Sequence, residues 1–162
     1  MTMQYDVKSY HNTVSGVAVP YRTRLKGVVI SPTTSTTYNI PIANNVAQSG
    51  TYDIPGTTTC TVTIAGHGVG LGSRVWLQFA DGDGVSNMYV VTAVTIDTFT
   101  VTTGTLTTSG DVTVYNQILV ELDCSTGTSF YTFIPGEGVL ALDGIYVGLP
   151  AASVVTSTIF YG

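Results

Sequence analysis

Few residues in this sequence have both the chemical type and the spacing that a reaction requires. Glu121 and Asp123 lie two positions apart in a segment expected to be a strand, which would place their carboxylates on one face about 6.5–7 Å apart. That separation falls within the range of the paired carboxylates of glycoside hydrolases. A solvent-facing strand gives the same spacing without a catalytic role, and no nearby segment suggests a sugar-binding cleft. We therefore expect the protein not to be an enzyme.

One glycine-rich loop, residues 66–72, contains His67. The neighbouring sequence holds no Asp, Glu, Cys or second His at the spacing of metal ligands. The loop leads into Ser73-Arg74-Val75 and then a strand, whereas a phosphate-binding loop ends in Gly-Lys-Ser/Thr before a helix. His67 is therefore predicted to be a structural loop residue, and no cofactor is expected.

A second loop, which begins Asp81-Gly82-Asp83, places carboxylates at alternate positions as calcium loops do. Positions five, six and twelve of an EF-hand would be Val85, Ser86 and Thr92, none of which fits the pattern. The loop is predicted to be an acidic β-turn, with weak calcium binding as the alternative. No resident metal is expected.

The composition favours a protein that associates with other chains. Charged residues make up 9% of the sequence and hydrophobic residues 44%, with a mean hydropathy of +0.34. Soluble domains carry about 25% charged residues, which keep their surfaces solvated. A chain this short of charge is expected to hide much of its surface against copies of itself or other partners.

The few charges are unevenly distributed. Residues 1–26 carry four basic residues against one acidic residue, a net charge of +3, and the remainder carries one against nine, a net charge of −8. The basic residues of the first segment are Lys8, Arg22, Arg24 and Lys26. An isoelectric point near 4.5 opposes attraction to a polyanion, and the segment has no ladder of aromatic residues for base stacking. Contacts between a basic strand and an acidic body are predicted instead of nucleic-acid binding.

No membrane association is expected, because the apolar runs are far shorter than the roughly 20 residues of a spanning helix. The first residues contain no hydrophobic stretch typical of a signal peptide. We expect synthesis in a cytoplasm, where Cys60 and Cys124 would be reduced, buried residues.

Strand-forming residues dominate the chain, and helix formers are scarce. Apolar and polar residues alternate in several segments, each typical of a half-buried antiparallel strand. The strands predicted in the middle are 59–64, 74–79 and 98–102, and those predicted around it are 22–30, 112–122, 130–134, 139–149 and 154–161. This pattern predicts an all-β protein, an antiparallel β-sandwich of jelly-roll or immunoglobulin-like type.

Turn-forming residues around 48–50 and 107–110 separate the middle strands from the outer ones. The prediction is an outer sandwich of residues 1–47 and 111–162 with a small inserted β module of residues 48–110. An insertion of this kind is tolerated where both of its ends leave the host at one exposed loop.

The first sixteen residues are predicted to form an extended arm, because polar and apolar residues alternate there without a turn. Tyr5, Lys8 and Tyr10 are candidate contacts to a neighbouring subunit, made by strand addition to a sheet edge or by ring packing. A frayed tail is the alternative.

Trp76 alternates with Arg74 and Gln78 and is predicted to share their outward face. An exposed indole can stack on a sugar ring. Trp76 is therefore a candidate glycan contact, although tryptophan also fills sandwich cores.

Both ends of the chain resemble a family of small virion structural proteins of tailed phages, especially cyanophages. The resemblance covers residues 1 to about 40 and 112–162, and its motifs are MQYDVKS and residues 22–27, 134–140, 143–147 and 159–162. Residues 59–103 are similar to small β modules that recur in phage tail and capsid-associated proteins. The resemblance implies a compact β-sandwich without enzymatic activity, located in the virion.

Within these matched ends, Pro135-Gly136 predicts a tight turn that leaves Glu137 free to face the basic strand. Arg22, Arg24 and Lys26 are predicted to pair with Glu137 or Asp143 of the same or an adjacent subunit.

The expected partners are copies of the chain and other virion proteins, either portal and tail proteins or the major capsid protein. The predicted role is a tail accessory or ring component, or a capsid decoration. A receptor- or glycan-binding adhesion module at the particle periphery is the alternative.

Overall fold

The computed structural model describes residues 7–33, 37–124, 128–150 and 155–162. Within these ranges the chain forms β-strands and no helix. The described residues therefore contain no helix that could cross a membrane. The strands pair antiparallel in several packed sheets. The predicted all-β class with a β-sandwich is confirmed.

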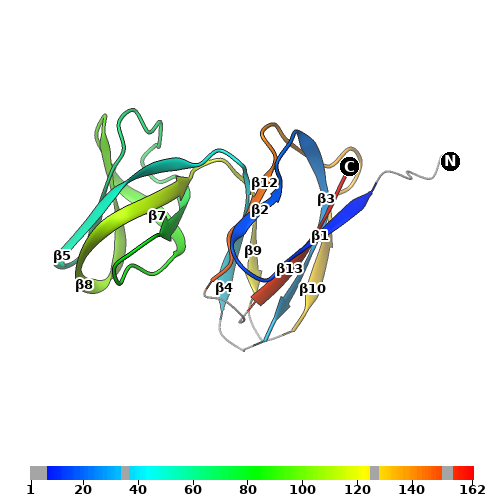
Figure 1. Cartoon of the computed structure of the whole chain (residues 1–162), viewed down its shortest axis with the longest axis horizontal. Coiled ribbons are helices and arrows are strands. Elements are labelled where there is room, and N and C mark those ends of the chain that lie inside the picture. The colour runs from blue at the N-terminus through cyan, green and yellow to red at the C-terminus, as the bar shows by residue number, and fades with distance from the viewer. Residues whose placement is uncertain (1–6, 34–36, 125–127, 151–154) are drawn as a thin grey trace. The chain divides into compact units, whose positions relative to one another are not determined.

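The chain divides into two compact units. We call them the outer unit, Met1–Asn45 with Leu119–Gly162, and the inserted unit, Val46–Ile118. The inserted unit therefore runs past the predicted end at residue 110, and Figure 1 shows the middle of the chain forming the long paired strands of that unit.

The outer unit is built from two facing sheets (Figure 1). Sheet A has the order β1-β13-β3-β10, with β11 also paired to β3, and sheet B has the order β2-β12-β4-β9. The strands of sheet A are β1 (Lys8–Asn12), β3 (Thr23–Pro32), β10 (Phe130–Phe133), β11 (Val139–Ala141) and β13 (Val155–Tyr161). The strands of sheet B are β2 (Gly16–Val19), β4 (Tyr38–Asn44), β9 (Ile118–Cys124) and β12 (Ile145–Val147).

Strand β3 organises sheet A because it pairs with three other strands. It pairs with β13 on one side and with β10 and β11 on the other. Side chains alternate between the two faces of a strand, and Val28 and Ile30 point into a core that sheet B closes with Ile40, Ile42 and other residues. Burial of each such side chain contributes about 1.5–3 kcal/mol.

The inserted unit has one sheet, sheet C, of order β5-β8-β6-β7 with a further pairing of β8 to β7. Its strands are β5 (Gln48–Thr63), β6 (Arg74–Phe79), β7 (Asn87–Val94) and β8 (Thr98–Tyr115). One half of β8 pairs with β6 and the other half with β7. The sheet curls around its own core, which contains Phe99, Leu77 and Val101.

Two of the glycines that indicated linkers lie inside long strands. Gly50 belongs to β5 and Gly110 to β8. A Cβ at Gly50 would overlap the main chain of Thr63 and the side chain of Ile64, and one at Gly110 would overlap the carboxylate of Asp81. These glycines allow close approach between strands and neighbouring groups, and neither of them marks a turn between the two units.

Two predicted strands are divided in the structure. The segment 112–122 belongs to β8 and β9, with a break at residues 116–117. The segment 139–149 gives β11 in sheet A and β12 in sheet B, because the chain crosses between the sheets at Gly144.

Gly144 has a φ of 101°, and a Cβ there would overlap the carbonyl oxygen of Val19. Gly144→Ala should therefore lower the free energy of unfolding by about 2–4 kcal/mol, because strain at positive φ adds to a main-chain overlap. Chemical denaturation measures this loss.

The matched control is Gly136→Ala. Gly136 has a φ of 69° but open space around its Cα, so only the backbone strain of about 1 kcal/mol is expected. Equal losses for the two variants would show that the crossing at Gly144 does not constrain the fold.

Candidate functional site

The outward face of sheet A carries a cluster of exposed aromatic rings. Val28 and Ile159 point into the core, so their neighbours along the strands point outward. The cross-strand pairs Tyr131↔Val29 and Phe133↔Gly27 bring β10 beside β3, and Phe160↔Gly27 brings β13 to the other side. We call the set Val29, Tyr131, Phe133 and Phe160, with Gly27 between them, the aromatic surface.

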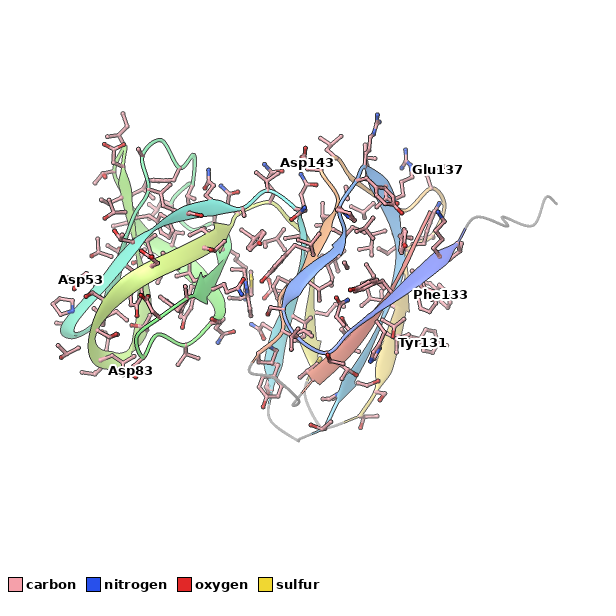
Figure 2. The ribbon with its side chains drawn as sticks, viewed as in Figure 1. Asp53, Asp83, Tyr131, Phe133, Glu137 and Asp143 are labelled. Carbon is pink, nitrogen blue, oxygen red and sulfur yellow. The ribbon has the colours of Figure 1, made fainter. Side chains whose placement is uncertain are left out.

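The two rings on β10 are unusually exposed for their size. Tyr131 is 69% and Phe133 is 72% exposed, and their ring centroids lie 5.5 Å apart at an interplanar angle of 72°. Edge-to-face contact of this kind holds the two rings as one apolar unit. Figure 2 shows both side chains projecting from β10 away from the body of the outer unit.

A groove of about 320 Å³ runs beside these rings. None of the residues that line it is charged. They are Val28, Val29, Ser129, Tyr131, Thr132, Phe133 and Phe160. With few polar groups available, the groove suits an apolar surface better than a charged ligand.

Gly27 gives the groove its depth. A Cβ at this position would lie 3.4 Å from the ring of Phe133, 3.7 Å from the ring of Phe160 and 3.1 Å from the carbonyl oxygen of Thr132. A side chain at position 27 would therefore fill the space between the two rings. The sequence motif 22–27 ends at this glycine.

The predicted basic strand is used within the chain. Lys26 is 9% exposed, and its Nζ donates to the main-chain carbonyl of Glu137 over 2.9 Å. Arg24 donates from Nη1 to the carbonyl of Gly138 over 3.4 Å, and Arg22 is exposed just before β3. Lys26 therefore contacts Glu137 through that residue's main-chain carbonyl, and pairing of the basic residues with carboxylates of an adjacent subunit stays a prediction.

The other predicted acidic partner, Asp143, is engaged elsewhere. Its Oδ2 accepts from Nδ2 of Asn44 over 2.8 Å, and its N–H donates to Oδ1 of Asn44 over 3.0 Å. This reciprocal pair ties the β11–β12 crossing to the end of β4. Figure 2 shows Asp143 and Glu137 at the same end of the outer unit.

The N-terminal arm adds to a sheet edge of its own chain. Lys8 and Tyr10 lie on β1, opposite Tyr161 and Ile159 of β13. Residues 8–12 are thus already paired within the chain, and their contact with a neighbouring subunit stays a prediction. The C-terminal strand offers an edge in the same molecule, so pairing there avoids the entropic cost of association. Tyr5 lies outside the described residues.

Trp76 is 1% exposed and thus buried, so the predicted exposure of its indole is wrong. The alternation correctly separates Trp76 from Val75 and Leu77, which belong to the core of the inserted unit. A position on the opposite face of β6 nevertheless does not make the side chain exposed. The indole has no open face for stacking on a sugar.

In the two loops that resemble ligand sites, the candidate side chains contact other residues of the inserted unit. His67 is 2% exposed, accepts at Nδ1 from the N–H of Val69 over 3.0 Å, and packs edge-on against Phe99. Asp81 accepts at Oδ1 from the N–H of Asp111 over 2.7 Å, so its carboxylate holds the loop against the interior of β8. In the part of the chain that the structure describes, no group of three His, Cys, Asp or Glu residues is placed to hold a metal.

Glu121 and Asp123 both lie on β9, where Glu121 is half-buried and Asp123 exposed. Asp123 adds to the rise in the pKa of the adjacent Cys124 thiol. Among the described strands, β9 lies at an edge of sheet B.

Both cysteines are free and buried, in agreement with the prediction of reduced residues. Burial raises the pKa of the Cys60 thiol to about 11, and the carboxylate of Asp53 adds to that rise. Burial also raises the pKa of Cys124 to about 11. Neither thiol is poised to act as a nucleophile at neutral pH.

The aromatic surface was missed in the sequence. The segment 130–134 was predicted as a strand, but alternation alone does not tell which side of a short aromatic run faces water. The available signal was the pair of large apolar residues at Tyr131 and Phe133, two apart on one face.

Comparison with known proteins places the chain in no family. No protein-family model matches it, and no curated protein matches it significantly. Among solved structures, the phage phi92 endosialidase is similar at a TM-score of 0.37 and 20% identity, over 79% of this chain. The chain spans about 20% of the length of that structure.

The raised thiol pKa values predict a loss of stability in alkali. An unfolded thiol loses its proton near pH 9.0, whereas the folded Cys60 and Cys124 keep theirs until about pH 11. The stabilisation is complete below pH 9.0 and is lost as the pH rises toward 11. Urea denaturation on either side of this interval measures the decline.

A Cys60→Val/Cys124→Val double variant serves as the control, because it lacks both thiols and should decline less over the same interval. Tyr89, whose pKa burial raises to about 12, is retained in both proteins. An identical decline in the two proteins would refute the assignment to the thiols.

Proposed function

We propose that this chain is a non-enzymatic structural protein of a phage virion, and that it assembles symmetrically with copies of itself through the aromatic surface. The observation that carries the self-assembly is the exposure of Tyr131 and Phe133 beside an apolar groove. Large rings left in water are unfavourable, and contiguous apolar surface on a protein marks an interaction site.

A second copy of the chain suits this surface better than a charged partner does. The lining of the groove carries no charge, and the chain as a whole has only 9% charged residues. Interface cores are depleted in charged residues and enriched in Tyr and Phe. The same rings on a second copy provide a partner of matching chemistry.

The assignment to a virion rests on the resemblance of residues 1 to about 40 and 112–162 to small virion proteins of tailed phages. A ring component at the tail and a capsid decoration both require only adhesive β surfaces. Copy number per purified particle separates them, because a ring contributes a few copies at one vertex and a decoration covers the lattice. Portal, tail or major capsid proteins would then be the further partners.

The adhesion alternative loses its main support in the structure. Trp76, the candidate glycan contact, is buried. The groove beside Tyr131 and Phe133 has few polar groups, whereas binding sites fix their ligands with placed polar groups. We therefore do not favour a glycan-binding role.

Replacement of both rings tests the proposal. Tyr131→Ser/Phe133→Ser should convert the assembled protein to a monomer, because the apolar area that drives association is removed. The mass in solution, measured by sedimentation velocity at several concentrations, reports the change. The unfolding free energy should stay within about 0.5 kcal/mol of the wild type at low concentration, since both side chains are exposed.

A matched control replaces two equally exposed apolar residues of the inserted unit, Leu71→Ser/Ile96→Ser. These residues are 73% and 81% exposed, and they lie outside the groove. The control should assemble as the wild type does. The proposal fails if the control becomes monomeric and the ring variant does not, or if the wild type is itself a monomer.

A further inference from the structure

The free edge of sheet A lies directly beside the aromatic surface. Strand β10 pairs with β3 on one side and, among the described strands, with none on the other. Its sequence, Phe130-Tyr131-Thr132-Phe133, contains no charge and no proline. Natural edge strands are usually protected by such residues against pairing with another chain.

The opposite edge of the same sheet is protected in that way. Strand β1 has the sequence KSYHN, which is polar at most positions and begins with Lys8. Its residues 8–11 are exposed. The two edges of sheet A therefore differ, and β10 is the one whose composition allows a further strand.

The hydrogen-bonding pattern shows which groups of β10 are available. The N–H of Ile134 donates to the carbonyl of Lys26 on β3 over 3.0 Å. In an antiparallel pair, the N–H and C=O of a residue point to one side, and those of the next residue point to the other. The main-chain groups of Thr132 therefore face β3, and those of Tyr131 and Phe133 face the open edge.

We propose that a second copy of the chain adds its β10 antiparallel to this edge, so that Tyr131 of each copy pairs with Phe133 of the other about a twofold axis at Thr132. This inference rests on the proposed self-assembly and specifies its geometry. A twofold interface uses the same patch on both subunits, and an edge strand with matching groups meets that condition.

This register follows from two requirements. Directly opposed residues lie on the same face of a sheet, so an outward ring must oppose an outward ring. When Tyr131 of each copy pairs with Phe133 of the other, the N–H and C=O groups of both residues form hydrogen bonds between the strands. All four main-chain groups that face the open edge of each strand are then used. It also places the ring of Tyr131 in one copy against that of Phe133 in the other, so that each ring covers part of the other's exposed surface.

Thr132 would then form a non-hydrogen-bonded pair with its own counterpart. The Cα atoms of such a pair lie about 4.5 Å apart, within the range of about 4.4–6.8 Å that a disulfide spans. Thr132 is half-buried, and the natural cysteines Cys60 and Cys124 are buried. A cysteine at position 132 therefore reports the proposed register.

The experiment is mild oxidation of the full-length Thr132→Cys variant, followed by non-reducing electrophoresis. The expected result is a covalent dimer formed in high yield at low protein concentration. Ser9→Cys on β1 is the control, because it places an exposed cysteine on the opposite edge of sheet A. The control should remain a single chain.

Two results would overturn the proposal in distinguishable ways. If the wild type assembles through Tyr131 and Phe133 but Thr132→Cys does not cross-link, or only Ser9→Cys does, the edge pairing is wrong while the proposed function stands. If the wild type is a monomer, both fail.

Should Thr132→Cys not fold, wild-type protein supplies a second measurement. In a mixture of isotope-labelled and unlabelled chains, nuclear Overhauser contacts between the ring of Tyr131 in one copy and that of Phe133 in the other support the register. Their absence in an assembled sample overturns it.

Discussion

The pairing of β3 with its neighbours is the interaction on which the outer unit depends. One strand bonds to β13, β10 and β11, which brings together residues from both ends of the chain. The two faces of β3 have different surroundings. Val28 and Ile30 pack in the core, whereas Gly27 and Val29 face outward. The aromatic surface exists because Gly27 leaves space there between Phe133 and Phe160.

Within the chain, the charged side chains hold the loops of the outer unit. Lys26 and Arg24 hold the loop after β10 through main-chain carbonyls, and Asp143 is paired with Asn44. These contacts position β10 and β11 against β3. The groove beside β10 is left with an uncharged lining, in keeping with a chain that is poor in charge.

Much of the fold was predictable because two-residue alternation is a local property. Strands 74–79 and 130–133 appear close to their predicted positions, and the all-β class followed directly. Long-range pairing was not predictable. The arm at residues 8–12 pairs with residues 157–161, and Trp76 is buried on the face of β6 opposite Val75 and Leu77. Local alternation predicts neither the pairing nor the burial. Gly50 and Gly110 looked like turns because close approach and chain reversal both require glycine.

The most direct test of the account is amide hydrogen exchange at Tyr131 and Phe133 as a function of protein concentration. In a single copy these two N–H groups point from the open edge of β10 into water, where exchange is fast. We predict that their exchange slows markedly as concentration rises and the edges pair. Fast exchange at every concentration would contradict the claim that a second copy covers this edge.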